Sequence, residues 1–323
     1  MPKFRLCFGD HLPNEPGGGG PYSTLPQERL PPDIIFEGTL EKARKKSERV
    51  SREKYHGDFR RWIERDNLQV VLLSGPSCVG KGPLIATVDN FFPKMSYSSV
   101  PVIRSRESRP KGPRPDEKYL WENPKYFRTA IEIRQLQNTS RFLVADCRGL
   151  PQAIDSDEIL GAENDIVLVE AYHKFGPELS KLNNLFYGDV KISSVFVSPV
   201  SEKEIEDFKS QSIKLDSKIY EIMLDKLNKR TIYQGKDSNN PKVAENNKRR
   251  AMSAYSELMS AHNYTHVLVN HDGEGHPNWN RRPNGEFIGK PIGDASGVVE
   301  SFINILTAGN SLNSEHWNSN TIY

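Results

Sequence analysis

Cysteine is scarce in this 323-residue sequence, and the three that occur (Cys7, Cys78 and Cys147) lie far apart. An odd number without a Cys-x2-Cys pair excludes a disulfide framework and a zinc-finger-like site. We therefore expect a reduced, cytoplasmic chain. Long hydrophobic runs are also missing, and no continuous apolar stretch follows the N-terminal charges. These absences argue against a membrane span and a secretory signal.

An excess of charge of one sign is likewise absent. The chain has 44 basic and 42 acidic residues, which gives a net charge of +2. No overall field then favours a nucleic acid or an anionic membrane surface as partner, and any anion binding has to be local. The length suits one sizeable α/β core with accessory segments.

Composition divides the chain into four parts. Residues 1–35 are so rich in proline and glycine that we expect a disordered arm. Residues 36–66 predict a basic helical extension, whose basic side chains suit solvent and lack the aromatic interleaving typical of RNA contacts. Residues 67–309 form the expected folded domain, and the polar tail 310–323 is expected to be disordered.

From Leu68 onward, apolar runs alternate with helical patterns, as in an α/β fold with a parallel sheet and right-handed crossovers. We predict strands at 69–74, 98–103, 142–145, 165–170, 192–197 and 266–270. We predict helices at 83–92, 124–136, 178–185, 202–229, 245–261 and 296–306. These elements make a doubly wound sheet, in which ligands bind beyond the carboxyl ends of the strands.

One segment carries most of the functional information: Val70-Val-Leu-Leu-Ser-Gly-Pro-Ser-Cys-Val-Gly-Lys-Gly82. Four apolar residues predict a strand buried on both faces, and Gly75 and Gly80 then let the backbone amides of a loop turn toward an anion. The positive end of the next helix and the Lys81 ammonium complete a phosphate-binding loop. The alternative is an ordinary glycine turn before a helix.

The loop departs from the full phosphate-loop pattern at one position. That pattern has Ser or Thr after the lysine to hold Mg²⁺, whereas this chain has Gly82 followed by Pro83. Proline is tolerated in a first helical turn, so the backbone cradle survives. Ser77 and Thr87 are the candidate substitutes for the missing hydroxyl.

A second basic segment follows the second predicted strand. It runs from Arg104 to Trp121 and contains Arg106 and Arg109 among several prolines. Guanidinium groups bind phosphate through two parallel hydrogen bonds, so an arginine pair at i and i+3 suits a monophosphate substrate. A solvated basic loop is the alternative.

With these motifs the chain resembles the guanylate kinase family. The resemblance begins with the loop Gly75–Lys81 and the pair Arg106-x-x-Arg109. It continues in collinear order through Tyr119–Phe127, Asp165–Glu170, Ser194–Ser201, Leu227-x-x-Arg230, Arg250 with Glu257-Leu258, and Val267–Asp272.

The resemblance implies a P-loop three-layer α/β/α fold with a mainly parallel sheet. A small NMP-binding lobe would occupy about 98–150, and a helical lid about 202–250. It further implies transfer of the γ-phosphoryl group of ATP, with Mg²⁺, to GMP, dGMP or a related nucleoside monophosphate. The implied catalytic residues are Lys81, Arg230 and Arg250. The implied ATP-binding residues are Gly75, Pro76, Ser77, Cys78, Val79, Gly80, Lys81 and Gly82. The implied NMP-binding residues are Arg106, Arg109, Tyr119, Glu170 and Asp146, with Glu170 also the candidate nearest to Mg²⁺.

The base pocket departs from the family pattern. The family has Phe-x-Glu where this chain has Phe142-Leu-Val144, and valine cannot accept hydrogen bonds from guanine. Asp146 is the candidate replacement, although it lies two residues away. Two alternatives therefore stand beside a guanylate kinase activity: a non-catalytic guanylate-kinase-like binding module, and a kinase for a modified nucleotide.

Further features of the loop and lid carry weaker expectations. Loop amides could lower the pKa of the Cys78 thiol, although a cysteine there more often packs. The polar insertion 231–247 predicts a longer, mobile lid. A second insertion predicts a turn at Asn284–Gly285. His266, His271 and His276 have no cysteine partners and no helical spacing, so we expect ordinary loop histidines rather than a metal site.

Overall fold

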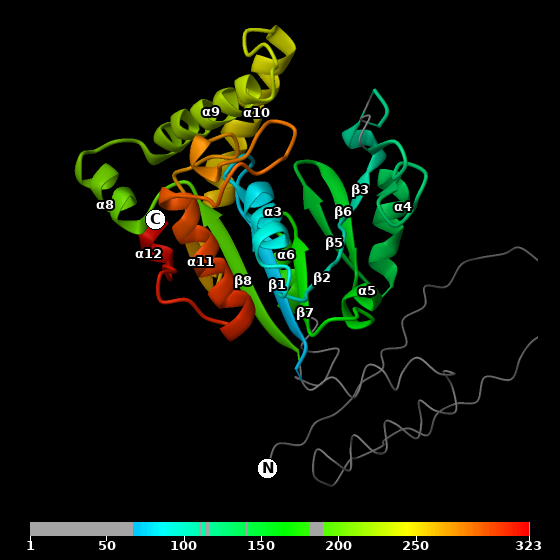
Figure 1. Ribbon diagram of the computed structural model, residues 1–323. Coiled ribbons are helices and arrows are strands. Elements are labelled where there is room, and N and C mark those ends of the chain that lie inside the picture. Colours follow the sequence, from blue (N-terminus) through cyan, green and yellow to red (C-terminus); the bar gives the residue numbers. More distant parts are fainter. Residues whose placement is uncertain (1–66, 110, 114–116, 140, 181–189, 323) are drawn as a thin grey trace, which may run out of the picture. The chain divides into compact units, whose positions relative to one another are not determined.

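The computed structural model describes residues 67–109, 111–113, 117–139, 141–180 and 190–322 (Figure 1). The chain divides into two units, Met1–Glu64 and Arg65–Tyr323, and all of the described residues belong to the second unit. The predicted disordered arm 1–35 and basic helix 36–66 lie outside the described residues. No helix in the described part of the chain is long and apolar enough to cross a bilayer.

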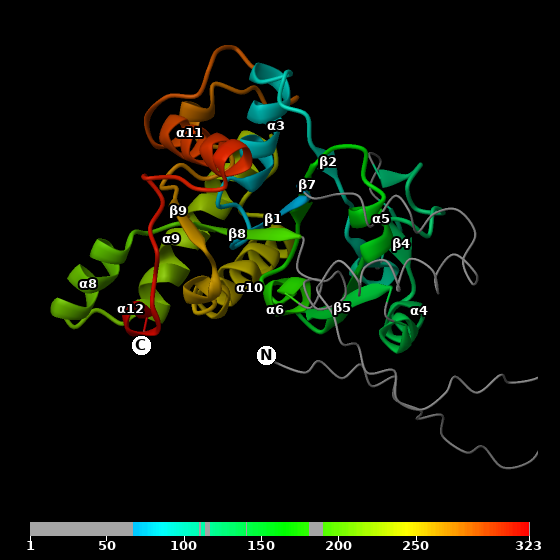
Figure 2. The ribbon, with the colours of Figure 1, turned by 90° about the horizontal axis from the view of Figure 1, so that it is seen from below.

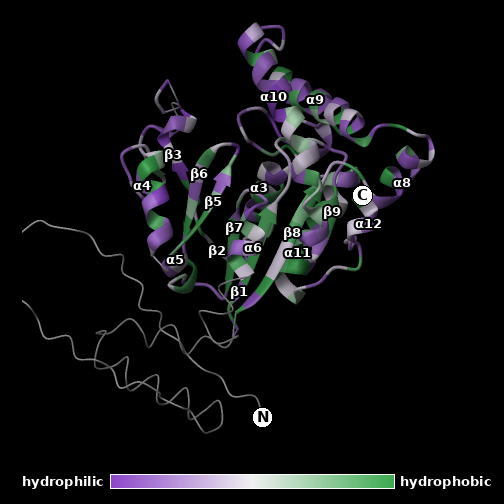
Figure 3. Cartoon of the chain, turned by 180° about the vertical axis from the view of Figure 1, so that it is seen from behind, coloured by the Kyte–Doolittle hydropathy of each residue, from purple (hydrophilic) through white to green (hydrophobic). Residues whose placement is uncertain are grey.

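The main sheet has five parallel strands in the order β2-β7-β1-β8-β9. In chain order these strands are β1 (Gln69–Ser74), β2 (Ser98–Ser99), β7 (Ile166–Glu170), β8 (Lys191–Ser198) and β9 (His266–Val269). All six residues of β1 are buried, as its apolar run predicts for a central parallel strand. Figure 3 shows the hydrophobic residues gathered along these central strands.

Helices cover both faces of the main sheet (Figure 2). Helices α3 (Lys81–Phe91) and α11 (Gly293–Ala308) lie on one face, and α6 (Phe175–Ser180) and α10 (Pro241–Leu258) lie on the other. One hydrophobic core joins α3 and α11 to strands β1, β7, β8 and β9. This architecture is the mainly parallel, three-layer α/β fold that the sequence predicts.

A smaller sheet, in the order β4-β3-β6-β5, stands beside the main one and has its own core. Its strands are β3 (Ile103–Ser105), β4 (Phe127–Arg128), β5 (Phe142–Cys147) and β6 (Leu150–Asp155). With them are α4 (Ala130–Gln135), α5 (Ser156–Leu160) and the 3₁₀ turns Arg106–Ser108 and Leu136–Asn138. We call this region the small lobe.

Two of the predicted strands differ from the strands observed in and next to the small lobe. The predicted strand 98–103 is two strands in different sheets, β2 and β3, with Pro101 between them; proline cannot donate a ladder hydrogen bond. The predicted strand 142–145 does not join the parallel sheet. It lies in β5, which pairs antiparallel with β6, a strand that the sequence analysis missed.

The region predicted to be the lid consists of α8 (Glu202–Ser210), α9 (Leu215–Tyr233) and α10. The single helix predicted at 202–229 is interrupted at 211–214, where Ser212 has a positive φ of 57°. Most of the insertion 231–247 is helical, because α9 runs on to Tyr233 and α10 begins at Pro241. Asn247 ties the two helices together through Asn228 and Thr231, each at 3.0 Å.

After β9 the chain forms the 3₁₀ turn Pro277–Trp279 and an antiparallel bridge between Arg281 and Phe287. This bridge confirms the turn predicted at Asn284–Gly285. The 3₁₀ turn Ala261–Asn263 precedes β9.

The C-terminal tail is ordered through residue 322, contrary to the prediction of disorder from 310 onward. Glu315 bridges Val267, and α12 (Ser319–Ile322) ends the described chain. The tail is held in place because Trp317 and Ile322 bury their apolar side chains.

Candidate active site

The loop between β1 and α3 fits its surroundings only with glycine at both ends. Gly75 and Gly80 have φ values of 135° and 108°, a region that L side chains rarely adopt. A Cβ at Gly75 would lie 2.4 Å from the Val197 carbonyl oxygen, and one at Gly80 would lie 2.3 Å from Asn270 Nδ2. The glycines therefore allow the loop to pack against strands β8 and β9.

The N-terminus of α3 is open to an anion. Gly80 caps the helix without a side-chain hydrogen bond, and no acidic residue occupies the first turn. Unpaired amides and the positive end of the helix dipole both favour negative charge at this position. The backbone therefore has the polarity that a phosphate group requires.

Lys81 folds back over the loop. Its Nζ donates to the carbonyl oxygens of Gly75 at 2.7 Å and Pro76 at 3.0 Å. Burial lowers the pKa of Lys81, against the opposing effect of nearby carboxylates. Those carboxylates belong to Glu170, Glu257 and Glu274. The ammonium thus stands at the loop among three acidic groups.

Cys78 packs in the loop. Its side chain is buried, and its Sγ donates to the carbonyl oxygen of Lys226 at 3.3 Å. Burial raises the pKa of the Cys78 thiol, and Arg230 and Arg250 only partly offset this rise. The structure therefore supports packing, rather than a reactive thiolate, at this position.

The structure brings the two predicted lid arginines together beside the loop. Arg230 Nη1 lies 2.9 Å from Glu274 Oε2, and its buried Nε has no partner among the described residues. Burial, together with the neighbouring Arg230, lowers the pKa of Arg250 to about 10. Two crowded guanidinium groups, one with an unused donor, suit a multiply charged anion.

The sequence analysis missed two groups that brace the loop. Asn270 Nδ2 donates to the Val79 carbonyl oxygen at 2.6 Å. The buried Trp279 donates from Nε1 to the Asp272 and Gly273 carbonyl oxygens at 3.2 and 3.1 Å, and its ring lies 3.0 Å from the position that a Cβ on Gly80 would take. The insertion after β9 thus supports the loop, a role that no local sequence signal reveals.

The predicted NMP-binding arginines are engaged within the small lobe. Arg109 makes a bidentate ion pair with the buried Glu117, with both N···O distances at 2.8 Å. Arg106 donates from Nη2 to the Trp121 carbonyl oxygen at 3.1 Å and lies over the Trp121 ring, and its Nε has no partner in the described part of the chain.

The other predicted NMP-binding residues, Tyr119, Asp146 and Glu170, come from three different parts of the fold. Tyr119 is 79% exposed. Asp146 is exposed and accepts from the Gly149 amide at 2.8 Å. Regular pairing of β5 with β6 puts Asp146 on the same strand face as Val144, which packs against the core of the small lobe. Glu170 ends β7 next to the loop, and its charge acts on Lys81.

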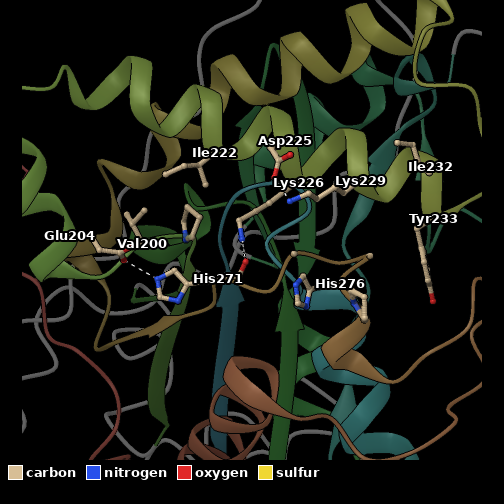
Figure 4. Close-up of a pocket in the computed structure, with 14 residues that line it drawn as sticks. Val200, Glu204, Ile222, Asp225, Lys226, Lys229, Ile232, Tyr233, His271 and His276 are labelled. Atoms are coloured by element: carbon tan, nitrogen blue, oxygen red, sulfur yellow. Dashed lines mark hydrogen bonds and ion pairs between the residues drawn. The ribbon is translucent and has the colours of Figure 1, made fainter.

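A pocket of about 610 Å³ is lined by residues of α9 and of the segment that follows β9, together with Pro199, Val200 and Glu204 (Figure 4). The backbone carbonyl oxygen of Lys226 accepts the hydrogen bond from Cys78. The Lys226 side chain reaches into the pocket, where its Nζ donates to the His271 carbonyl oxygen. Burial lowers the pKa of Lys226. The lining is formed by Pro199, Val200, Glu204, Ile222, Asp225, Lys226, Lys229, Ile232, Tyr233, His271, Gly273, Gly275, His276 and Pro277.

The predicted substitutes for the metal hydroxyl are engaged elsewhere. Thr87 is buried and donates to the Pro83 carbonyl oxygen at 2.8 Å, and Ser77 accepts from Arg148 at 3.2 Å. No cluster of three metal-binding side chains occurs among the described residues. The carboxylates whose charges act on Lys81 are those of Glu170, Glu257 and Glu274, and carboxylate oxygens are ligands that suit Mg²⁺.

Of the comparisons with known proteins, the comparison of structures gives matches and those of the sequence do not. No family model and no curated protein matches the sequence. Among solved structures, the crystal structure of guanylate kinase from Anaplasma phagocytophilum matches with a TM-score of 0.40 and 14% sequence identity. The match covers 76% of this chain and 87% of that chain.

Proposed function

We propose that the protein transfers the γ-phosphoryl group of ATP to a nucleoside monophosphate, with GMP or dGMP favoured by the sequence resemblance. One observation carries the proposal: Lys81 and the two predicted lid arginines Arg230 and Arg250 gather at a glycine-bounded loop that leads into the N-terminus of α3. Phosphoryl transfer needs positioning and charge stabilisation above all, and this arrangement provides both.

In this proposal the loop amides from Gly75 to Gly82 hold the donor phosphates. Lys81 exchanges its two carbonyl partners for phosphate oxygens. Arg230 offers its unused Nε, and Arg250 adds a second guanidinium, where charge builds up on the transferring group. Mg²⁺, held by the phosphates with Glu170 or Glu274, would supply further charge neutralisation.

The pocket beside Lys226 is the proposed site for the nucleoside part of ATP. Lys226 links it to the loop through the Cys78 hydrogen bond, and its volume of about 610 Å³ is within the range of small-ligand pockets. Lys226 and Lys229 give it basic groups, and Glu204 and Asp225 give it acidic ones.

On the acceptor side, Arg106, Arg109 and Tyr119 are proposed to bind the monophosphate. Arg109 then has to exchange its ion pair with Glu117 for the acceptor phosphate. The pair keeps the guanidinium oriented as a bidentate donor, which is the geometry that a phosphate also uses.

A non-catalytic binding module is the second candidate. Two observations favour it: Gly82 offers no hydroxyl to a metal, and the guanidinium of Arg109 is already neutralised by Glu117. A kinase for a modified nucleotide remains the third, because Val144 is part of the core of the small lobe and does not offer a carboxylate to guanine.

A coupled assay with ATP, Mg²⁺ and a panel of nucleoside monophosphates separates these candidates. We expect turnover with at least one guanine nucleotide, and a loss of at least about 10²-fold in Lys81→Ala. Lys94→Ala, at an exposed lysine beyond the end of α3, is the matched control and keeps its activity. ATP binding without turnover of any acceptor supports the binding module, and a loss under about threefold in Lys81→Ala contradicts the catalytic role.

A further inference from the structure

Arg148 stands at the tip of the β5–β6 hairpin in the small lobe. With Gly149 it forms a two-residue turn, in which both residues have positive φ values of 55° and 85°. Arginine rarely adopts this conformation, and the sequence motifs assign it no role. The turn delivers a guanidinium from the small lobe to the phosphate-binding loop.

Three contacts fix the Arg148 guanidinium. Its Nη2 donates to the Ser77 hydroxyl at 3.2 Å and also to Glu257 Oε1 on α10. Its Cζ lies 5.6 Å from the centre of the Tyr172 ring. Ser77 lies in the middle of the loop, so a phosphate held there comes within reach of the same guanidinium.

Glu257 gives the guanidinium a firm anchor. Its side chain is only 2% exposed, and Oε1 also accepts from the Ser253 hydroxyl at 2.9 Å. A buried carboxylate needs a cationic partner, so Arg148 stays near α10 whether or not a ligand is bound. Among the described contacts both hydrogen bonds of Arg148 start from Nη2, which leaves Nε and Nη1 for a ligand.

Several cations gather around Ser77. Lys81, Arg148, Arg230 and Arg250 interact there with one another and with the carboxylates of Glu170, Glu257 and Glu274. Arg148 also contributes to the lowered pKa of Arg250. An anion between these cations and the helix N-terminus would relieve their mutual repulsion.

We propose that Arg148 is a fourth phosphate-binding cation of the loop, after Lys81, Arg230 and Arg250. Its ligand would be the terminal phosphates of a nucleoside triphosphate, and this inference rests on the proposed function. In the absence of nucleotide, the Ser77 hydroxyl stands in for a phosphate oxygen. When phosphate enters, the guanidinium keeps Glu257 and turns its other donors to the phosphate. The phosphate is then bound by residues of the small lobe, the loop and the predicted lid together.

Calorimetric titration with inorganic tripolyphosphate tests this inference without turnover. Arg148→Ala alone leaves a buried carboxylate unpaired, so the informative variant is Arg148→Ala/Glu257→Gln, compared with Glu257→Gln alone. We expect Glu257→Gln to bind within about threefold of the wild type, and the double variant to bind about tenfold more weakly, as for the loss of one charge-assisted hydrogen bond.

Arg134→Ala/Glu257→Gln controls for charge alone, because Arg134 is exposed on α4 of the same lobe. It should bind tripolyphosphate as Glu257→Gln does. A loss below about fivefold in Arg148→Ala/Glu257→Gln, or an equal loss in the Arg134 control, overturns the inference. Absence of tripolyphosphate binding by the wild type overturns it as well. Absence of turnover with preserved tripolyphosphate binding counts against the proposed function alone.

Discussion

The two halves of the candidate site hold their cations in different ways. At the loop, Lys81 is bonded to two carbonyl oxygens and Arg230 keeps a buried donor unused. In the small lobe, Arg109 is fully engaged by a buried carboxylate, Glu117. On binding an anion, Lys81 in this donor half therefore has to exchange only carbonyl contacts, whereas Arg109 in the acceptor half has to exchange a buried ion pair.

The surroundings explain this difference. The loop lies against Val197, Asn270 and Trp279, which belong to or adjoin the large core of the main sheet. The small lobe has a separate core cluster around Ile103, Ile133 and Ala153, and two of its strands have only two or three residues. Short strands provide few ladder hydrogen bonds, so side-chain ion pairs such as Arg109–Glu117 contribute to holding its loops.

The largest expected effect comes from filling the loop. Gly80→Ala places a methyl group against Asn270 and forces a left-handed conformation on alanine. We expect the free energy of unfolding to fall by about 1–3 kcal/mol, with loss of measurable ATP binding in calorimetry.

Gly82→Ala is the matched control, because its added Cβ would meet Glu274 Oε1 at an ordinary contact distance of 3.6 Å. It should keep ATP binding. Equal ATP affinity in Gly80→Ala and the wild type would contradict the binding of ATP at this loop.

The next largest effect is expected in the acceptor half. Glu117→Gln weakens the competing ion pair, so the guanidinium of Arg109 becomes available to the acceptor phosphate. We expect the KM for the monophosphate to fall about threefold to tenfold, while the KM for ATP stays unchanged in steady-state assays. Glu122→Gln, at an exposed position of the same lobe, should change neither constant. A raised acceptor KM in Glu117→Gln would show that the pair positions Arg109 instead of blocking it.

A smaller gain is expected from restoring the missing hydroxyl. The backbone at Gly82 has room for a side chain, so Gly82→Ser supplies an oxygen next to Lys81 and near Glu274. We expect the Mg²⁺ concentration for half-maximal activity to fall about twofold to tenfold, the effect of one hydrogen bond or ligand contact. Gly82→Ala separates the hydroxyl from the added carbon. If both variants respond alike to Mg²⁺, the metal does not lie beside Gly82.

The smallest effect is a pH dependence of stability on the loop side. Burial opposes the charged form of His271, but hydrogen bonds to Glu204 and Asp294 prevail and raise its pKa. Charged His271 therefore stabilises the folded chain fully at pH values below the pKa of histidine in the unfolded chain, about 6.5. This stabilisation is lost as the pH rises through the higher pKa of His271 in the folded chain. Because His271 is half exposed, we expect a Tm difference of only about 1–2 °C between wild type and His271→Gln at pH 6, vanishing at pH 9. A difference that grows with pH would contradict this assignment.

Sequence signals predicted the donor half better than the acceptor half, for physical reasons. Strand β1 and the loop follow from adjacent residues, an apolar run and two glycines, and the structure has β1 at the predicted residues. The hairpin β5–β6 was missed because its turn is Arg148-Gly149 rather than the Asn-Gly or Asp-Gly that marks such turns.

Tertiary contacts could not be predicted from local patterns. The partners of Arg109 and Arg148 are carboxylates 8 and 109 residues away in the chain, and no periodicity links them. The ordered tail was missed because the two residues that hold it, Trp317 and Ile322, stand alone in a polar segment.

Phosphorus NMR of the complete reaction tests the central claim most directly. The sample contains the full chain, ATP, Mg²⁺ and an equimolar mixture of the common nucleoside monophosphates. The account predicts that ADP and one nucleoside diphosphate accumulate in equal amounts, and that Lys81→Ala abolishes both signals. Release of inorganic phosphate alone, or an unchanged ATP spectrum with the wild type, would contradict phosphoryl transfer at this loop.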